Sequence, residues 1–311
     1  MRVLVVGAGS IGRRHHENLE NLGAQSTLRG WRNYDIAALE TDLARHDAMV
    51  IATATDIRLS LIECAARAGK PVYVEKPLAA SMAEFETIAR VVAPIAGRSM
   101  LGYMMRYHPA FRVLTDSDRA DVFHFSLTIG HDVTQWRQNW HFSQSYAARA
   151  NGGGVLLDLC HEIDMAACLF PGLALNTVES LGHEDFPGVD MISRLGLENA
   201  QALGNVEMDY LTPALHRRTI LHGTRQMFDF DFATEQYRIV TSGGVRMINA
   251  PLNRNEMFLA AMRDFLALVQ GHVTSGNPAL PRLDLALPSA RLVAEARDKR
   301  RFVGTVAKEL S

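Results

Sequence analysis

The sequence of 311 residues is poor in cysteine and has no long apolar run. Its three cysteines, Cys64, Cys160 and Cys168, are odd in number and widely spaced, which argues against a disulfide scaffold. No run reaches the roughly 18 apolar residues of a membrane span. The first apolar stretch meets a glycine too soon for a secretion signal. We therefore expect a cytoplasmic protein without a membrane partner.

An excess of charge of one sign is also missing. The 32 Lys and Arg residues balance 34 Asp and Glu residues, for a net charge of −2, so electrostatics gives no reason to expect nucleic acid as the main partner. Hydrophobic residues make up 48% of the chain. That fraction provides a core for each of about two domains of roughly 150 residues.

Short apolar runs alternate with helical patterns in the first part of the chain. The runs are typical of strands buried on both faces, and they lie at 3–6, 48–52, 71–75 and 99–102. The helical patterns between them lie at 11–22, 59–68 and 81–93. This alternation predicts a parallel sheet with helices on both faces.

The pattern changes after about residue 115. Apolar residues now alternate with a period of two, as in antiparallel strands with one face toward solvent, at 122–129, 204–211, 217–221 and 227–232. Helices are predicted at 155–170, 255–270 and 289–300. The chain thus combines an α/β part, 1–117, with an α+β part, 118–311, which has a mainly antiparallel sheet.

A glycine motif, Gly7-Ala8-Gly9-Ser10-Ile11-Gly12, follows the first strand and opens the first helix. In such a motif Gly7 permits the tight turn, Gly9 lets a pyrophosphate approach the backbone, and Gly12 lets the helix pack against the strand. The amides at the helix start then face the phosphates. The motif predicts a Rossmann dinucleotide-binding domain; a different nucleotide-like cofactor, such as a methyl donor, and a turn that binds nothing are the alternatives.

A further strand should end near Leu28, and the residues after it bear on the choice of cofactor. An NAD site usually has an acidic residue here, whereas this chain has Arg29 and Arg32 and no carboxylate before Asp35. Two guanidinium groups suit a 2′-phosphate. We therefore expect NADP, with NAD as the alternative if both arginines are only solvated surface groups.

Lysine and histidine provide the candidate chemistry. Glu75-Lys76-Pro77 ends a predicted strand, at the sheet edge where ligands of open α/β sheets bind, and Lys76 there can share a proton with a substrate hydroxyl. In the predicted helix 155–170, Asp158, His161 and Asp164 follow at steps of three and so share one face. A histidine between two carboxylates can exchange a proton near neutral pH. A surface lysine and an ordinary polar helix face are the alternatives, and the spacing of Cys160 and His161 predicts no metal site.

These motifs resemble the glucose–fructose oxidoreductase, inositol dehydrogenase and rhizopine-catabolism family, Gfo/Idh/MocA. The resemblance also includes Leu101-Gly102-Tyr103, Arg106-Tyr107-His108-Pro109 and Met208-Asp209-Tyr210-Leu211, and it extends over nearly the whole chain. It implies a Rossmann domain followed by a domain with a large open sheet. It also implies reversible hydride transfer between a nicotinamide cofactor and a hydroxyl-bearing carbon of a sugar or cyclitol.

The resemblance assigns roles to individual residues. It makes Lys76, His161 and Asp158 catalytic, with His161 the general acid/base. It implies cofactor contacts from Gly7, Gly9, Ser10, Ile11, Gly12, Arg29, Arg32, Thr53, Glu75 and Lys76. It implies substrate contacts from Lys76, Arg106, Trp136, Asp164 and His161. Further candidates for an acidic or phosphorylated sugar are Arg137, Arg149, His216, Arg217 and Arg218.

Some positions depart from the family pattern. Relatives step four residues from the aspartate to the histidine, but Asp158 and His161 are three apart, and one residue rotates a helical side chain by about 100°. Relatives often have asparagine where Met104 stands and histidine where Arg58 stands. The shorter step is similar to that of members found with bacterial surface-sugar biosynthesis.

The resemblance leaves three functions open. The first is an NAD(P)-dependent dehydrogenase or reductase acting on a CH–OH group. The second is NAD-dependent glycoside cleavage by transient oxidation, and the third is a non-catalytic dinucleotide-binding regulatory protein. A homodimer or homotetramer packed through the large sheet is also implied.

Overall fold

The computed structural model describes residues 1–136 and 141–310, which form two compact units. The first unit consists of Met1–His108 and Leu252–Ala290, and the second of Pro109–Pro251 and Arg291–Ser311. Each unit thus contains two separate segments of the chain. The single boundary after residue 117 stays a prediction about domains.

The first unit is built on a five-stranded parallel sheet of order β2-β1-β3-β4-β5. Its strands are β1 Arg2–Val6, β2 Gln25–Arg29, β3 Ala48–Ile51, β4 Val72–Val74 and β5 Met100–Leu101. The central strands β3 and β4 are fully buried, as expected for a sheet covered on both faces. The chain order reverses between β1 and β3, which is where ligands bind in such sheets.

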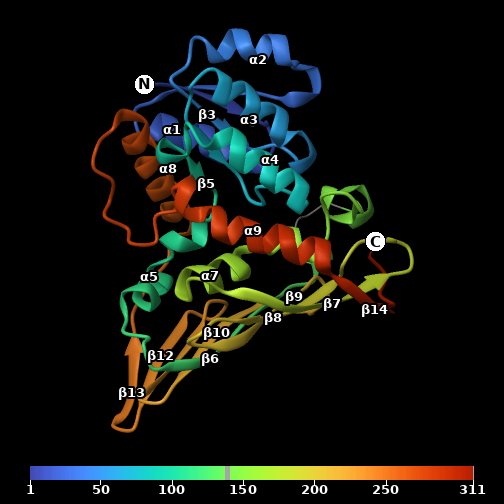
Figure 1. Cartoon of the computed structure of the whole chain (residues 1–311), viewed down its shortest axis with the longest axis vertical. Helices are drawn as coiled ribbons and strands as arrows, with labels where there is room; N and C mark the ends of the chain where they lie inside the picture. The colour runs from blue at the N-terminus through green and yellow to red at the C-terminus, as the bar shows by residue number, and fades with distance from the viewer. Residues whose placement is uncertain (137–140, 311) are drawn as a thin grey trace. The chain divides into compact units, whose positions relative to one another are not determined.

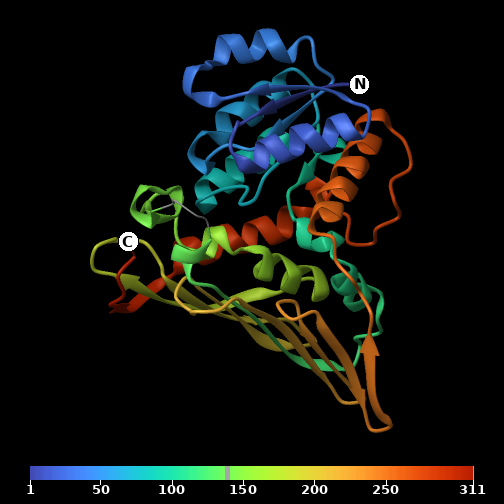
Figure 2. The same cartoon turned by 180° about the vertical axis from the view of Figure 1, so that it is seen from behind.

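Helices cover both faces of this sheet (Figures 1 and 2). Helix α1 (Ser10–Asn21) packs with α8 (Arg254–Gln270) on one face, while α2 (Ile36–Leu43), α3 (Arg58–Arg67) and α4 (Met82–Val92) form a row. Short 3₁₀ helices lie at Trp31–Asn33, Thr55–Ile57, Ala96–Arg98 and Met104–Tyr107. The long helix α9 (Leu283–Lys299) starts in this unit, six residues before the predicted start at 289, and ends in the second.

The second unit is built on a nine-stranded mixed sheet of order β13-β12-β11-β10-β6-β9-β8-β7-β14. Among the strand pairs that the structure describes in this sheet, only β6–β9 and β7–β14 are parallel. The strands are β6 Val122–Gly130, β7 Ala174–His183, β8 Ile192–Glu198, β9 Leu203–Asp209, β10 His216–Gly223, β11 Gln226–Asp231, β12 Gln236–Thr241, β13 Gly244–Ile248 and β14 Arg301–Val306. Together the two sheets confirm the predicted fold class.

One face of the second sheet forms the core of its unit. Phe125, Leu127 and Ile129 of β6 point to this face and are buried, and α7 (His161–Leu169) packs on β6 and β9. The other helices of the unit are α5 (Pro109–Asp116) and α6 (Val155–Asp158). Its 3₁₀ helices are Val133–Gln135, Phe142–Gln144 and Tyr146–Ala148.

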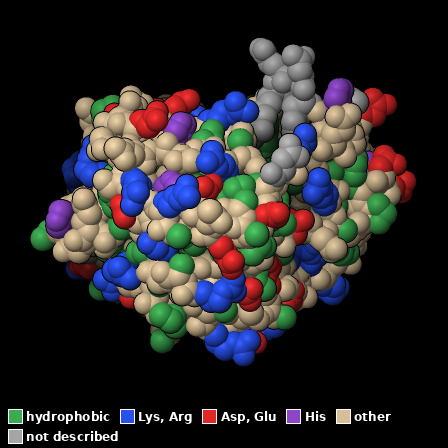
Figure 3. Space-filling model, turned by 90° about the horizontal axis from the view of Figure 1, so that it is seen from above, with side chains coloured by type: hydrophobic (Ala, Val, Ile, Leu, Met, Phe, Trp, Pro, Cys, Tyr) green, Lys and Arg blue, Asp and Glu red, His purple; other side chains and the backbone are tan. Residues whose placement is uncertain are grey.

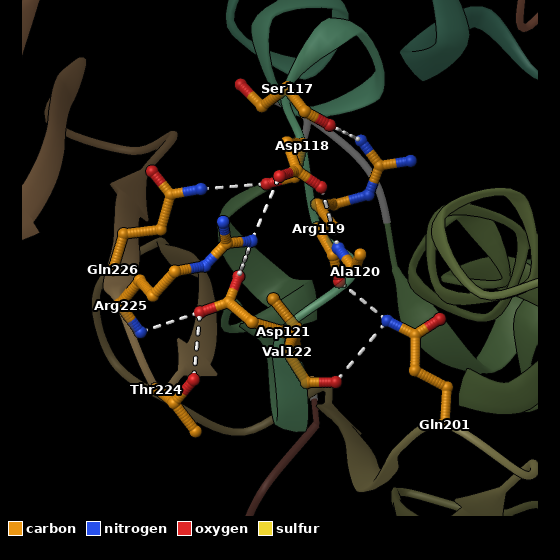
Figure 4. Close-up of polar contacts among 10 residues, drawn as sticks. All are labelled: Ser117, Asp118, Arg119, Ala120, Asp121, Val122, Gln201, Thr224, Arg225 and Gln226. Atoms are coloured by element: carbon orange, nitrogen blue, oxygen red, sulfur yellow. Dashed lines mark hydrogen bonds and ion pairs between the residues drawn. The ribbon is translucent and has the colours of Figure 1, made fainter.

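The connection from α5 to β6 is tied to a distant hairpin turn. Arg225, in the β10–β11 turn, donates to the carboxylates of Asp118 (2.9 Å) and Asp121 (3.3 Å) (Figure 4). Gln201 donates to the carbonyl oxygen of Arg119 at 2.6 Å in the same cluster. These contacts fix where β6 enters the sheet.

The surface carries both signs of charge. On the face shown in Figure 3, Lys and Arg side chains lie interspersed with Asp and Glu side chains. Within the part of the chain that the structure describes, no helix is long and apolar enough to cross a membrane.

Candidate functional site

The glycine loop after β1 is packed too tightly for any side chain at two positions. Gly7 has φ +116°, and an added Cβ would lie 2.3 Å from the carbonyl oxygen of Ala52. A Cβ on Gly12 would lie 1.7 Å from the carbonyl oxygen of Gly7. The loop therefore lies directly against the end of β3, at the point where the sheet order reverses.

Gly9 differs from its neighbours in the loop because it borders open space. No heavy atom lies within 4 Å of an added Cβ, and Gly9 is the N-cap of α1 without a side-chain cap. The amides of the first turn, at Ser10, Ile11 and Gly12, have no carbonyl partner within the helix. Open space beside free amides at the positive end of a 12-residue helix fits an anionic diphosphate.

Arg29, the last residue of β2, and Arg32, which follows the strand, have different surroundings. Arg29 Nε donates to Asp42 Oδ2 at 2.9 Å, and the Tyr34 hydroxyl donates to the same oxygen at 3.0 Å. Burial alone would raise the pKa of the Asp42 carboxyl, but the hydrogen bonds from Arg29 and Tyr34 lower it below its usual value. Arg32 is exposed. Asp42 is thus a carboxylate beside Arg29 that no local sequence pattern predicted.

Glu75, in the motif with Lys76, forms a buried pair with His15. His15 Nε2 lies 2.7 Å from Glu75 Oε1, and the histidine ring is buried between Tyr73 and Phe258. Burial alone would raise the pKa of the Glu75 carboxyl, but the His15 hydrogen bond and the charges of His15, Lys76 and Arg58 lower it. Nothing in the sequence indicated that Glu75 pairs with His15, 60 residues earlier.

Lys76 is half-buried and follows β4 at the carboxyl edge of the parallel sheet. Its amide donates to Glu75 Oε2 at 3.3 Å. Thr53 follows β3 at the same edge, and its buried hydroxyl has no hydrogen-bond partner among the residues described. The first unit thus brings the glycine loop, Thr53, Glu75 and Lys76 to one edge of its sheet.

Arg106 has a different environment from the one predicted. It is buried in the first unit, where it donates to Ser289 Oγ at 3.0 Å and lies over the ring of Tyr103. Its role as a substrate contact stays a prediction.

The predicted continuous helix 155–170 is wrong. The chain forms α6 up to Asp158 and α7 from His161, separated by Leu159 and Cys160. Leu159 leaves helical geometry, with φ −101° and ψ 26°. The inference that Asp158 shares a helix face with His161 therefore fails, while His161 and Asp164 still lie three apart within α7.

Asp158 is held by two tyrosine hydroxyls. Tyr146 donates to Asp158 Oδ1 at 2.6 Å, and Tyr210 donates to Asp158 Oδ2 at 3.1 Å. Burial, with a smaller effect of Asp158, raises the pKa of Tyr210 well above its usual value, so its phenol remains a donor. Asp158, His161 and Asp164 are all buried. The tyrosines lie 12 and 52 residues from Asp158, and no local spacing points to them.

Trp136 lies against two aromatic rings of its own unit. Its ring is 5.4 Å from that of Tyr210 and 6.3 Å from that of His131. The C-terminal segment braces the same loop, because Lys308 Nζ donates to Asp132 Oδ2 at 2.6 Å. Trp136 therefore lies beside the tyrosine that holds Asp158.

The remaining candidates are divided between two faces of the sheet. Arg217 Nε donates to the buried Glu162 at 2.5 Å, on the core face. Arg218 points to the opposite face and forms a bidentate ion pair with the carboxylate of Asp229. Among the other candidates, Arg149 is exposed, His216 is half-buried, and Arg137 lies outside the described residues.

Asp190 caps α6 from a distant position in the chain. Its Oδ2 accepts the Leu156 amide at 2.8 Å, and its carbonyl accepts the Val155 amide at 2.9 Å. Gly154 fits against this cap, since an added Cβ would lie 2.2 Å from Asp190 Oδ1. Burial raises the pKa of the Asp190 carboxyl, although the Leu156 amide and Arg297 act to lower it.

We expect Asp190→Ala to lower the free energy of unfolding by about 1–2 kcal/mol, because the helix loses its cap. Asp190→Asn keeps an acceptor oxygen and should cost less. A raised folded-state pKa means that ionisation of Asp190 opposes folding as pH rises through that pKa. Urea unfolding at acid and neutral pH tests this. As pH rises, the free energy of unfolding of Asp190→Asn should increase relative to that of the wild type. A free energy of unfolding of Asp190→Asn that falls relative to the wild type between acid and neutral pH would contradict a raised Asp190 pKa.

No family model matches the chain. The sequence is 26% identical over 280 residues to an inositol 2-dehydrogenase of Rhizobium meliloti (strain 1021), covering 81% of this chain and 79% of that protein. It is 27% identical over 247 residues to scyllo-inositol 2-dehydrogenase (NAD(+)) of Bacillus subtilis (strain 168), covering 70% and 69%. Among solved structures, levoglucosan dehydrogenase in complex with NADH and levoglucosan matches with a TM-score of 0.79 at 18% identity, over 96% of this chain and 97% of that one. At that identity the structural likeness shows a shared fold.

Proposed function

The chain belongs to the Gfo/Idh/MocA family of oxidoreductases, and from this we propose that it is an NAD(P)-dependent dehydrogenase or reductase. Its substrate would be a hydroxyl-bearing carbon of a sugar, a cyclitol or a sugar derivative such as a bacterial surface sugar. The observation that carries the proposal is the glycine loop, where Gly7 and Gly12 allow close packing and Gly9 leaves space at the start of α1. The two inositol dehydrogenases among its relatives support a cyclitol or a similar cyclic polyol as the substrate class.

In this proposal the nicotinamide dinucleotide would be held by the glycine loop, with Thr53, Glu75 and Lys76 as further contacts. When bound, such a cofactor supplies the carbon that accepts or donates a hydride. The protein's residues handle the proton of the substrate hydroxyl. His161 takes that proton during oxidation and returns it during reduction, while the Lys76 ammonium stabilises negative charge on the oxygen. Asp158 and Asp164 would act as supporting or substrate-contacting carboxylates.

A panel of sugars, cyclitols and sugar nucleotides, each with NAD⁺ and NADP⁺, tests the proposal by absorbance of the reduced nicotinamide. We expect turnover with at least one cyclic polyol. Glycoside cleavage without net reduced cofactor would favour the transient-oxidation alternative. Dinucleotide binding without turnover of any compound would favour a regulatory protein.

We further propose that NADP(H) binds more tightly than NAD(H), because Arg29 ends β2 and Arg32 follows it. No acidic side chain stands between Arg29 and Asp35 to repel a phosphate group. Fluorescence titration should give a lower Kd for NADPH than for NADH. Arg32→Ala should reduce this preference, since it removes an exposed cation without exposing the Asp42 carboxylate. Tighter binding of NADH by the wild type would overturn the proposal.

A homodimer or homotetramer formed through the solvent face of the nine-stranded sheet is also proposed. Exposed apolar side chains on this unit, among them Leu203 and Met247, support it. Light scattering at micromolar concentration tests it, and a monomer would reject it.

A further inference from the structure

Arg58 is a buried cation at the first turn of α3, with 4% of its surface exposed. Lysine and arginine side chains are rarely buried to this extent unless their charge is paired and their donors are used. Its positive charge acts on two carboxyls. Burial raises the pKa of Glu84, and the Arg58 charge acts to lower it. Burial also acts to raise the pKa of Glu75, but the His15 hydrogen bond and the charges of His15, Lys76 and Arg58 bring that pKa below its usual value. The site can therefore hold a charged guanidinium.

The guanidinium donates to three backbone carbonyls at the edge of the first sheet. Arg58 Nη1 donates to the carbonyl oxygen of Glu75 at 2.5 Å and also to that of Pro77. Arg58 Nη2 and Nε donate to the carbonyl oxygen of Thr53 at 2.7 and 3.2 Å. One side chain thus connects the ends of β3 and β4.

Glu75 and Pro77 are the residues on either side of Lys76. Arg58 holds the carbonyl before Lys76 and the carbonyl after it, while the Lys76 amide bonds to the Glu75 carboxylate at 3.3 Å. The backbone of Lys76 is therefore fixed from both directions, and only its side-chain torsions remain to place the amine. The sheet-edge position of Lys76 thus depends on the buried Arg58 side chain.

We propose that Arg58 is a positioning residue that sets the location of the Lys76 amine for hydride and proton transfer. This proposal rests on the proposed function of Lys76. A planar guanidinium suits the task because it presents several donors in a fixed geometry, which the single ammonium of lysine does not. A displacement of about 1 Å at a reacting group costs roughly 100-fold in rate.

The test compares Arg58→Met and Arg58→Lys with Arg67→Met. Methionine keeps an apolar stem of similar length and removes every donor, and lysine keeps the charge with a compact donor. Arg67 lies on the same helix, but it is exposed and bonds only to Glu40 and Cys64 in the described contacts. Circular dichroism first establishes that each variant is folded.

The first readout is independent of activity. The Lys76 amine is pulse-labelled with an acylating reagent over a range of pH, and the modified peptide is measured by mass spectrometry, with Lys70, Lys299 and Lys308 as internal references. We expect Lys76 in Arg58→Met to label roughly tenfold faster, as in a locally opened segment. The reference lysines should label at wild-type rates, and Arg67→Met should not differ from wild type.

The second readout is kinetic. In Arg58→Met we expect kcat to fall about 100-fold. The changes in the Kd for the dinucleotide and in the KM for substrate should be much smaller, because in the proposed site the glycine loop holds the diphosphate. Arg58→Lys should recover part of kcat. Unchanged Lys76 labelling, or a loss confined to dinucleotide affinity, would overturn the proposal, as would failure of both variants to fold.

These readouts keep the two hypotheses apart. If the wild type turns over no substrate, the proposed function fails, but a changed labelling rate in Arg58→Met still supports the positioning of Lys76. If the wild type is active and the labelling is unchanged, only the role of Arg58 is lost.

Discussion

Lys76→Ala should lower kcat by about three orders of magnitude, within the range that proton transfer and charge stabilisation contribute. The dinucleotide should bind with nearly unchanged Kd, because in the proposed site the glycine loop and the start of α1 hold its phosphates. The variant should fold, since Lys76 is half-buried and its backbone amide bond to Glu75 remains. Single-turnover absorbance and fluorescence titration measure the two quantities separately.

Lys70→Ala is the matched control for this experiment. Lys70 is also half-buried and lies just before β4, whereas Lys76 lies just after it. The control removes the same charge from the opposite end of the same strand, so it should keep full activity. Full activity of Lys76→Ala on a proven substrate would remove Lys76 from the mechanism.

The second large effect concerns two glycines three residues apart. In Gly12→Ala the new methyl group would lie 1.7 Å from the carbonyl oxygen of Gly7 and 2.9 Å from its carbonyl carbon. Both atoms belong to backbone that is itself packed on Ala52, so neither can move aside cheaply. We expect a loss of roughly 3 kcal/mol or more in the free energy of unfolding, and a matching loss of dinucleotide binding.

Gly9→Ala should leave the stability of the fold nearly unchanged and weaken dinucleotide binding. Gly9 has φ −72°, which any residue adopts, and open space surrounds its added Cβ. The free energy of unfolding should change by less than about 0.5 kcal/mol. Binding should weaken by roughly 1.4 kcal/mol, a tenfold rise in Kd, because the methyl group occupies the approach of the diphosphate. Equal binding by Gly9→Ala and wild type would show that no phosphate passes this position.

The parallel sheet of the first unit could be predicted because its signals are local. The apolar strands and the glycine motif each lie within a few residues of the element that they define. The helical pattern at 81–93 likewise corresponds to α4, whose N-cap Ser81 accepts the Glu84 amide at 3.2 Å. Periodicity also found the central strands β6, β9, β10 and β11 of the second sheet.

The rest of the second sheet could not be predicted from local pattern. Strands β7, β8, β12, β13 and β14 were missed. β7 is half-buried or exposed over its first four residues, and in β8 a serine, Ser193, takes one of the buried positions, so neither sequence shows a clear apolar alternation. Every residue of β13 before Ile248 is exposed, which leaves no buried face to detect. The break between α6 and α7 was also missed. Leu159 and Cys160 are residue types that occur inside helices, so nothing in the local sequence marks the end of α6.

The sequence predicted which residues belong to the candidate site, but not which residues hydrogen-bond to them and hold them in place. Lys76, Glu75 and the glycines stand in recognisable motifs. Their supports come from far along the chain: His15 binds Glu75 across 60 residues, and Tyr210 binds Asp158 across 52. No spacing rule connects such pairs, because only the folded sheet brings them together.

The division of the first unit into two segments has a consequence for biosynthesis. Helix α8 packs on α1, where Asn255 and Asn18 exchange amide hydrogen bonds and Phe258 lies against His15. A ribosome delivers α8 only after the whole of 109–251 has emerged. Until then the nascent first unit exposes one flank of α1, so the unit that begins the chain is completed only after most of the second unit has been synthesised.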